Sequence, residues 1–371
     1  TFVERYKDDK HQLDPQRKAV NPVAYALLAH NEERTYNIQP QFDIQYRLLG
    51  LDEESTQLTY KGTVVLSIYN AYKDSYYPWE LKSNVYTQTE GNINTASSSF
   101  DKSFGFTTRH QLTFIPFIAN HDHSVRLFFK GEVTSGTSSA QSLSSYLLPS
   151  GTITSAAGGG HLKATTTGAG HWRSAYWLFQ GHYAFQSKYS LDATLRHEGN
   201  TRFGESHRWG LFYALSGRWN ISDESWMEPT KKWLSMFAVR FGWGVTGNQP
   251  PKADTHYSVY NVDGKYINSI GMRPGNIRLT DLRWEQVMDW NLGWNIGLFN
   301  DLLTADINLY SKQTSDLFTY DPKIPSTSGF TSLPTENGGD MKNQGYEINL
   351  SLNRVKIAGD LSASFNLTFA N

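Results

Sequence analysis

Residues 288–310 alternate strictly between apolar and polar side chains, and this pattern predicts two long amphipathic strands. The apolar positions of the first strand are Met288, Trp290, Leu292, Trp294, Ile296 and Leu298. The polar positions between them are Asp289, Asn291, Gly293, Asn295 and Gly297. After a reversal at residues 299–302, the apolar positions resume at Leu303, Ala305, Ile307 and Leu309. Because successive side chains of a strand point to opposite faces, we predict a hairpin with one apolar and one polar face.

The same period of two recurs along most of the chain. We predict further strands at residues 36–48, 60–70, 107–119, 124–134, 171–185, 189–198, 207–219, 233–245, 344–353 and 361–370. Residues 1–34 are charged and irregular apart from a short helix over residues 22–29, where Pro22 occupies a favourable first position. About twelve strands in six hairpins result. Tight turns join the strands within hairpins, and long polar connections such as 71–106, 135–170 and 312–341 join the hairpins, a sorting typical of outer-membrane barrels.

Strand length separates a membrane barrel from a soluble sheet, which shows the same alternation. A strand of about 11 residues tilted by ~40° spans roughly 28 Å, close to the apolar band of an outer-membrane barrel and about twice a usual soluble strand. We therefore expect an all-β fold, a transmembrane antiparallel β-barrel wall; a soluble β-sandwich or propeller is the alternative. With Ile296 near the membrane midplane, Ile296→Arg is expected to cost about 2–4 kcal/mol, and Asn295→Arg much less.

Composition and charge exclude several other classes of protein. The mean hydropathy is −0.51, which a barrel tolerates because only every second strand residue meets lipid. No run of about 18 apolar residues exists, so we expect no transmembrane helix. The net charge of −1 offers no footprint for nucleic acid, and the absence of Cys excludes disulfides and thiolate metal sites. Because Thr1 is preceded by no signal segment and Asn371 follows a predicted strand, we expect this sequence to be a piece of a longer protein.

Three short motifs resemble chemical sites, and each has a simpler structural interpretation. Residues 242–247 fit G-x-G-x-x-G, but a dinucleotide site needs a following helix, and a proline pair follows instead. We expect Gly242 and Gly244 on the polar face of a strand that exits into a loop at Gly247-Asn248. His121 and His123 have the spacing of metal ligands but occupy a turn, and residues 52–54 are a charged turn rather than an acid–base pair. We predict no catalytic residues, no metal ligands and no cofactor.

The polar strand faces and the aromatic residues of the long connections supply the candidate functional residues. The polar faces are expected to line the barrel lumen, where their side chains contact a plug or line a solute path. The predicted lumen-facing residues are Arg196, Arg218, Arg240, Asp289, Asn291, Asn295, Asp306 and Asn308, together with Arg47, Arg126, Lys130, Glu132, Asp192 and Glu198. Exposed aromatic rings stack on sugars or on peptide side chains, but also serve as membrane-interface or lid contacts. The candidate stacking residues are Tyr76, Tyr77, Trp79 and Trp172.

Several stretches resemble a known family. Residues 240–249 read RFGWGVTGNQ, and residues 337–350 read NGGDMKNQGYEINL, which contains an N-x-G-x-E pattern at 343–347. Together with LRWE at 282–285, NIGLFNDLLTADINLYSKQTSDLF at 295–318 and NPVAYALLAHNEE at 21–33, they resemble the barrel region of SusC/RagA-type TonB-dependent outer-membrane transporters of Bacteroidota.

This resemblance implies a 22-stranded barrel closed by an N-terminal plug, driven through a TonB box and covered by a SusD-like lipoprotein. Residues 1–371 correspond to part of one such barrel domain, and neither a plug nor a TonB box is found in them. The implied function is active import of large nutrients, glycans or oligopeptides, by a multi-pass protein in the outer-membrane lipid. No bond-making chemistry is expected. The alternatives are a non-energised structural or adhesive outer-membrane barrel and a soluble carbohydrate-binding β-domain.

Overall fold

The structure is a computed structural model in which the chain forms two compact units. It describes residues 22–50, 52, 54–78, 81, 94–149, 153–250, 256–258, 260–267, 269–319, 325–330, 335–358 and 361–371. The described residues of the first unit come from 1–42, 64–107 and 134–171, and those of the second from 43–63, 108–133 and 172–371.

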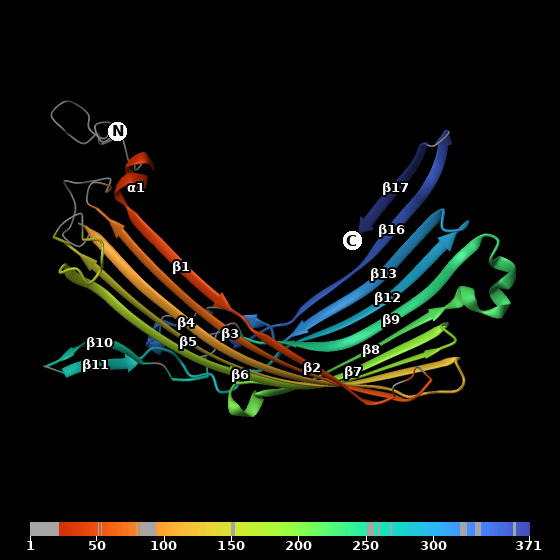
Figure 1. Cartoon of the computed structure of the whole chain (residues 1–371), viewed down its shortest axis with the longest axis horizontal. Coiled ribbons are helices and arrows are strands. Elements are labelled where there is room, and N and C mark those ends of the chain that lie inside the picture. The colour runs from red at the N-terminus through yellow and green to blue at the C-terminus, as the bar shows by residue number, and fades with distance from the viewer. Residues whose placement is uncertain are drawn as a thin grey trace. The chain divides into compact units, whose positions relative to one another are not determined.

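One antiparallel sheet of thirteen strands contains most of the described strand residues (Figure 1). Its members are β1 (His30–Ile38), β2 (Gln41–Leu49), β3 (Gln57–Tyr77), β4 (Thr95–Ile115), β5 (His123–Tyr146), β6 (His161–Phe185), β7 (Tyr189–Asn200), β8 (Trp209–Asn220), β9 (Leu234–Asn248), β12 (Glu285–Leu298), β13 (Leu303–Ser315), β16 (Met341–Ala358) and β17 (Leu361–Ala370). The strands are ordered β1-β3-β4-β5-β6-β7-β8-β9-β12-β13-β16-β17, and β2 also pairs with β3. Because β1 and β2 correspond to one predicted strand, the prediction of about twelve strands is confirmed for this sheet.

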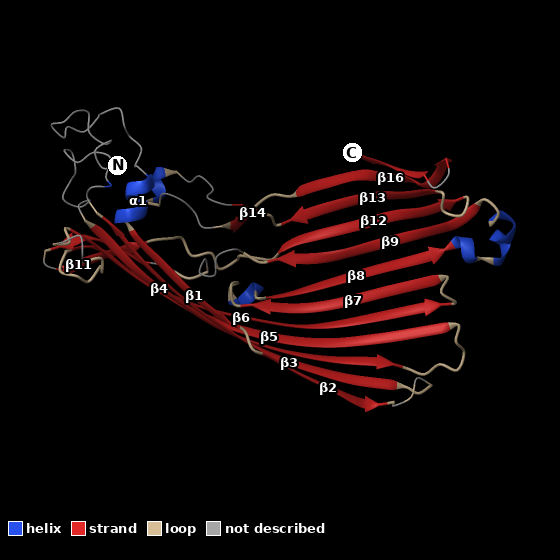
Figure 2. Ribbon diagram, turned by 45° about the horizontal axis from the view of Figure 1, so that its top comes forward, coloured by secondary structure: helices blue, strands red, loops and turns tan. Residues whose placement is uncertain are grey.

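The remaining elements are short. β10 (Tyr260–Tyr266) pairs with β11 (Ser269–Pro274), and β14 (Phe318–Thr319) pairs with β15 (Glu336–Asn337). The predicted helix is confirmed as α1 (Pro22–Leu28). The described residues also contain the 3₁₀ turns η4 (Glu205–His207), η5 (Ile221–Asp223), η6 (Ser225–Thr230) and η7 (Ser326–Ser328). Figure 2 shows η4 and the η5–η6 pair at opposite ends of β8. Among the described helices, none has both the length and the apolar character needed to cross a bilayer.

In the first unit, β1 begins earlier than the sequence predicted. It pairs with β3 from His30↔Tyr76 to Ile38↔Ile68, so the expectation that residues 30–34 are irregular was wrong. The strand then breaks at Pro40, which has no N–H to donate, although its carbonyl still accepts a hydrogen bond from the Leu66 amide at 3.1 Å. Backbone pairing with β3 therefore orders a charged segment that has no apolar face.

The predicted polar connections 71–106 and 135–170 were wrong over most of their length. β3 continues to Tyr77, β4 starts at Thr95, β5 continues to Tyr146 and β6 starts at His161. Neighbouring strands there are linked by hydroxyl pairs, and these include Ser75–Ser97 (2.7 Å), Thr107–Thr134 (3.2 Å) and Ser142–Thr166 (2.8 Å). Alternation appears only where one face of a sheet meets an apolar medium, so strands that are polar on both faces carry no such signal.

In the second unit, the predicted hairpin over residues 288–310 is confirmed as β12 and β13. These strands pair from Gln286↔Ser315 to Leu298↔Leu303. The turn places Phe299, Asn300 and Asp301 at φ values of 56°, 56° and 61°, a left-handed conformation that Asn and Asp tolerate well. On its other side β12 pairs with β9, so that β7, β8, β9, β12 and β13 lie side by side in this order (Figure 1).

Two small apolar cores lie at opposite ends of these strands. Phe203, Phe212, Val245, Leu282, Trp284 and Phe318 form the first core, in which the Phe203 and Trp284 ring centroids are 4.4 Å apart. β9 ends at Asn248, so the chain leaves the strand where predicted, but neither Gly247 nor Asn248 adopts the positive φ expected of a turn. A Cβ atom at Gly247 would overlap the Phe212 ring, so close packing explains this glycine.

The second core lies at the other ends of the strands, where Ile221, Met227 and Leu234 pack together. Ile296 packs against it and lies two residues from the end of β12. The prediction that Ile296 sits near the membrane midplane was therefore wrong, because this side chain lies close to the end of its strand and packs against this core.

Candidate functional site

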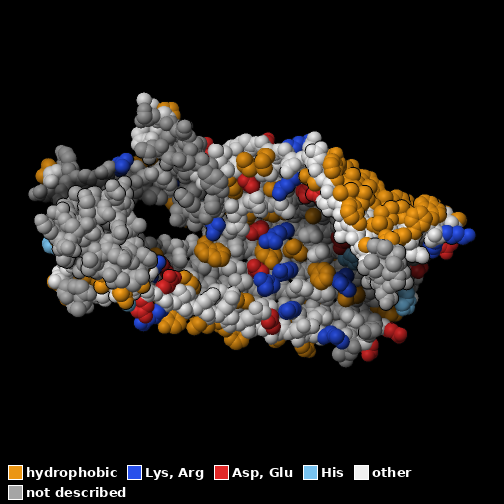
Figure 3. Space-filling view, turned by 90° about the horizontal axis from the view of Figure 1, so that it is seen from above, with side chains coloured by type: hydrophobic (Ala, Val, Ile, Leu, Met, Phe, Trp, Pro, Cys, Tyr) orange, Lys and Arg blue, Asp and Glu red, His pale blue; other side chains and the backbone are white. Residues whose placement is uncertain are grey.

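The strand register places the predicted polar residues of the second unit on one face of the sheet. Arg240 lies opposite Arg218 of β8 and Gly293 of β12, and Gly293 lies opposite Asn308 of β13. Alternation from these positions puts the following residues on the same face: Arg196, Arg218, Arg240, Asp289, Asn291, Asn295, Asp306 and Asn308. Figure 3 shows acidic and basic side chains intermingled on the visible surface. We call the sheet face that carries these eight residues the polar face.

A first cluster on the polar face is centred on Arg240. Its Nη2 donates to Asp306 Oδ2 at 2.9 Å and to Asn308 Oδ1 at 3.1 Å, across the intervening strand β12. Asn295 Nδ2 also donates to Asp306 Oδ2, at 2.5 Å. The Arg240 side chain crosses β12 at Gly293, where a Cβ atom would lie 2.8 Å from Asn308 Oδ1 and 3.0 Å from Arg240 Nη2. The missing side chain of Gly293 therefore lets β9 and β13 interact directly.

A second cluster links four strands through charged and aromatic groups. Arg109 Nε of β4 and the Tyr176 hydroxyl of β6 both donate to Glu132 Oε2 of β5, at 2.7 and 3.1 Å. The Arg196 guanidinium of β7 lies 3.9 Å from the Tyr176 ring centroid, in a cation–π contact, and its Nε donates to Glu198 Oε2 at 2.8 Å. Sequence reasoning missed Arg109 and Tyr176, although both occupy polar-face positions of predicted strands.

The opposite face of β5 to β8 is apolar and is bordered by two rows of aromatic side chains. Near the tight turns the rings of His123, Phe185, Tyr189 and Trp219 follow one another at centroid distances of 4.8, 6.2 and 6.0 Å. At the other end Trp177, His197 and Trp209 lie within 5.6 Å of one another. Large apolar side chains between the rows are exposed, and Leu195 and Leu211 are examples at 47% and 53%.

The spacing of the two rows matches a membrane. Trp209 and Trp219 stand ten residues apart on β8, which is about 33 Å along a strand and roughly 25 Å along the normal at ~40° tilt. That is close to the height of the lipid-facing apolar band of an outer-membrane barrel, which aromatic girdles border on both sides. We call this surface the outer face.

The four candidate stacking residues have different environments. Tyr76 is buried at 1% exposure in a core with Ala96, Leu148 and Ala156, so its ring is covered. Tyr77 is half-buried, and its hydroxyl lies 3.1 Å from that of Tyr25. Trp172 is half-buried on β6, at a polar-face position by strand alternation. Trp79 lies outside the described residues.

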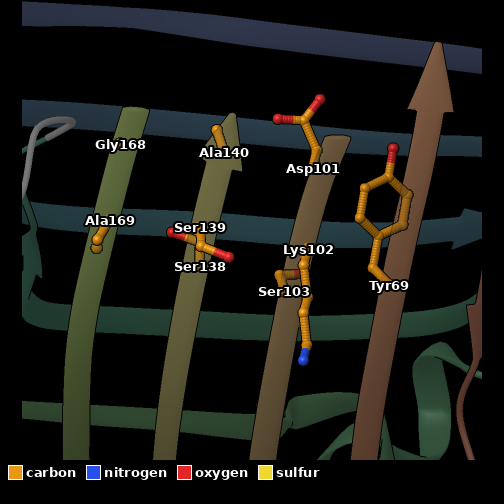
Figure 4. Close-up of a pocket in the computed structure, with 10 residues that line it drawn as sticks. Tyr69, Asp101, Lys102, Ser103, Ser138, Ser139, Ala140, Gly168 and Ala169 are labelled. Atoms are coloured by element: carbon orange, nitrogen blue, oxygen red, sulfur yellow. The ribbon is translucent and has the colours of Figure 1, made fainter. Parts of the chain in front are cut away.

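A shallow cavity in the first unit offers another aromatic ring (Figure 4). It has a volume of about 390 Å³ and is floored by small residues of β4, β5 and β6 that include Ser103, Ser138 and Gly168. Tyr69 projects from β3 on one side of it, and the Asp101 carboxylate projects from β4 (Figure 4). Sequence reasoning missed this cavity, because its residues come from four strands and three of the four segments were predicted to lie in loops.

Among the described residues, neither the histidine motif nor the glycine motif forms a metal or nucleotide site. His123 Nδ1 lies 2.9 Å from the Tyr183 hydroxyl, and the described part of the chain contains no group of three or more His, Asp or Glu side chains that could hold a metal ion. Gly242 and Gly244 lie opposite Asn291 and Asp289 on the polar face, and β9 continues past them as a strand. A dinucleotide site would need a helix at that point.

An antiparallel strand wall with one charged face and one apolar face of membrane height, bordered by aromatic girdles, is the wall of a transmembrane β-barrel. Residues 5–371 match the family described as TonB dependent receptor-like, beta-barrel. The chain belongs to this family, and it is a multi-pass protein of the outer membrane.

Known relatives support the SusC/RagA-type resemblance, which is confirmed. The chain is 30% identical over 197 residues to the TonB-dependent receptor SusC of Bacteroides thetaiotaomicron, a match covering 50% of this chain and 19% of that protein. It is 31% identical over 175 residues to the TonB-dependent receptor P39 of Formosa agariphila, covering 47% and 16% respectively. The match thus spans less than a fifth of either relative.

Among solved structures, the RagAB peptide transporter superposes with a TM-score of 0.78 at 20% identity. The superposition covers 97% of this chain and 40% of that one. At this identity the likeness concerns the fold alone.

Proposed function

We propose that this chain forms part of the lumen wall of a TonB-dependent importer of large nutrients, either glycans or oligopeptides. The observation that carries the proposal is the polar face of paired charges in a chain of this barrel family. In this proposal the polar face lines the solute path or holds the plug, and the outer face meets lipid.

The partners follow from the same proposal. TonB acts through the plug, and a SusD-like surface lipoprotein covers the outer mouth; the relationship to SusC supports both. The chain carries out translocation, and no bond is made or broken. Large solutes that pass a wall carrying both signs of charge meet many weak contacts, which favours release as well as entry.

The cavity beside Tyr69 is a candidate contact for the solute. An aromatic ring gives a stacking surface for a sugar or an apolar side chain, while Asp101 accepts hydrogen bonds from hydroxyl or amide groups. The half-buried rings of Tyr77 and Trp172 are further candidates. Tyr76 is a core residue and is not part of this proposal.

The test is uptake by cells that carry the full-length protein. We expect a fluorescently labelled heptasaccharide or decapeptide to accumulate inside the outer membrane, and we expect accumulation to stop in a TonB-deficient strain or with a protonophore. Accumulation that survives loss of TonB would argue against energised import. Surface binding with no accumulation of either probe would favour the alternative, a structural or adhesive barrel.

A further inference from the structure

A second cavity in the second unit is lined by two arginines that the clusters described above do not use. Its volume is about 560 Å³. One side comes from the segment between β7 and β8, which contributes Ser206 and Arg208. The other side comes from the segment between β9 and β12, which contributes His256, Tyr257 and Arg278. Two connections that are distant in sequence thus bring two guanidinium groups to one cavity.

Arg208 has no counter-charge in the described part of the chain. Its side chain forms no ion pair or hydrogen bond with a described residue, and its Nε is buried without a hydrogen-bond partner. A partly buried guanidinium without an anion is costly, because the lost hydration is not replaced. An oxyanion in the cavity would supply the missing acceptor.

Arg278 is the second cationic side chain of the cavity, and it is exposed. Its Nε donates to the His256 backbone carbonyl at 3.1 Å, which fixes the plane of the guanidinium and leaves its two terminal nitrogens without a described protein partner. The carboxylate that lines the cavity, Glu205, is exposed. The nearby Asp281 already interacts with His207 (3.5 Å) and Arg283 (3.9 Å). The cavity therefore carries more positive than negative charge.

The cavity adjoins the core that packs at the ends of the polar face. Gly204 lines the cavity and follows Phe203, while Thr280 lines it two residues before Leu282. Phe203 and Leu282 pack with Phe212, which lies opposite Arg196 of the polar face in the strand register. A ligand in this cavity is thus next to the face that we propose lines the solute path, which favours the solute over a membrane lipid as its source.

We propose that this cavity binds a carboxylate or sulfate group of the transported solute, so that the cargo of this importer is anionic. The inference rests on the proposed import function. The planar guanidinium of each arginine presents paired N–H donors that match the oxygens of a carboxylate or sulfate. The Ser206 and Tyr257 hydroxyls are further donors at the wall of the cavity.

The experiment measures binding of sodium sulfate to the full-length protein in detergent by calorimetry, against sodium chloride at equal ionic strength. We expect Arg208→Gln and Arg278→Gln each to weaken sulfate binding about tenfold, as loss of a charge-assisted hydrogen bond does. Glu205→Gln removes the lining carboxylate and should tighten binding a few fold, a gain that misfolding cannot produce. Arg273→Gln is the matched control, since Arg273 lies on β11 in the same connection but does not line the cavity. Equal affinity in all variants, or an equal loss in Arg273→Gln, would overturn the site.

Two further probes identify the source of the anion. A galacturonate trimer should displace sulfate, and a neutral galactose trimer should not. Displacement by lipopolysaccharide micelles but not by the acidic trimer would assign the site to lipid and overturn the proposal. Binding and uptake separate the two hypotheses: TonB-dependent uptake without sulfate binding refutes only the anion site, whereas sulfate binding without uptake refutes only the import function.

Discussion

At the scale of single residues, Gly293 shows how an absent side chain organises the polar face. Gly293→Val would fill the space through which Arg240 reaches Asp306 and Asn308. We expect this change to destabilise the folded protein by about 1–3 kcal/mol, because overpacking displaces a charged hydrogen bond. Denaturant titration of the protein in lipid vesicles measures the change.

Gly242 provides the control for this prediction. It lies on the same face of the adjacent strand, and a Cβ atom there would meet nothing within 4 Å. Gly242→Val should therefore change the free energy of unfolding by less than about 0.5 kcal/mol, since it fills open space. If both substitutions lower the free energy of unfolding equally, the loss would come from placing valine at any glycine of the sheet. The explanation that Gly293 leaves space for the Arg240 side chain would then be refuted.

The ring of Tyr69 allows a residue-scale test of the cavity in the first unit. Tyr69→Ala should weaken binding of the transported solute by roughly two- to tenfold, the usual effect of one stacking contact. Tyr72 is the matched control, because it lies on the other face of β3 and stacks on Phe100 at 4.6 Å. Equal losses of affinity in Tyr69→Ala and Tyr72→Ala would refute the proposal that this cavity contacts the solute.

The alternation predicted which residues share a face of the sheet, but not which residues form hydrogen bonds or pack against one another. Arg240 and Asp306 were both predicted on the polar face, and the register places them there. Their hydrogen bond depends on the register of three strands and on the gap at Gly293. Tyr76 was predicted to be a stacking residue but is buried, because a residue from a distant connection, Leu148, covers it. Neither contact can be predicted from the local sequence, because each joins residues that are far apart along the chain.

At the scale of strands, β8 gives a direct test of the two faces. Leu215 is exposed on the outer face between the aromatic rows, and Ser216 is its neighbour on the polar face. Leu215→Arg should cost about 2–4 kcal/mol of folding free energy in a bilayer, because the charge is placed near the lipid midplane. Ser216→Arg should cost much less, and equal costs in a vesicle titration would refute the face assignment.

The turn between β8 and β9 makes folding sensitive to acid. Hydrogen bonds from the Tyr189 hydroxyl and from Trp219 Nε1 hold the pKa of the Glu224 carboxyl below its ordinary value, and Lys188 Nζ lies 3.6 Å away. A carboxyl with a lowered folded-state pKa stabilises the fold above its unfolded pKa of about 4.3, and this contribution is lost as pH falls through the folded value.

We therefore expect the melting temperature in detergent to fall as pH drops below about 4.3, and to fall less steeply in Glu224→Gln. Circular dichroism melts between neutral and acid pH measure this difference. Glu228→Gln is the control, because Glu228 forms an exposed pair with Lys231 in the same segment. The same change of slope in both variants would mean that general charge loss, rather than the Tyr189–Trp219 pocket, sets the acid response.

Strand prediction succeeded where one side of the sheet is apolar and failed elsewhere. The hairpin of β12 and β13 was predicted nearly to its ends, because Trp, Leu and Ile mark every second position. Residues 95–106 of β4, 135–146 of β5 and 161–170 of β6 were predicted as loops, because Ser, Thr and Gly occupy both faces there. Those segments are ordered by cross-strand pairing, which involves residues far apart in the sequence.

At the scale of the whole chain, the exposed outer face determines which solvent the protein requires. Large apolar side chains are exposed on neighbouring strands, and they include Leu191, Leu195, Leu211, Tyr213 and Leu215. A continuous apolar surface of this kind causes aggregation in water. We expect the purified chain to sediment when detergent is removed and to stay dispersed in micelles or vesicles, as analytical ultracentrifugation can measure. Replacing Leu191, Leu195 and Leu215 together by Ser should lower both aggregation and vesicle insertion. A chain that remains monomeric without detergent would instead be a soluble carbohydrate-binding β-domain, and the exposed leucines would then need another partner than lipid.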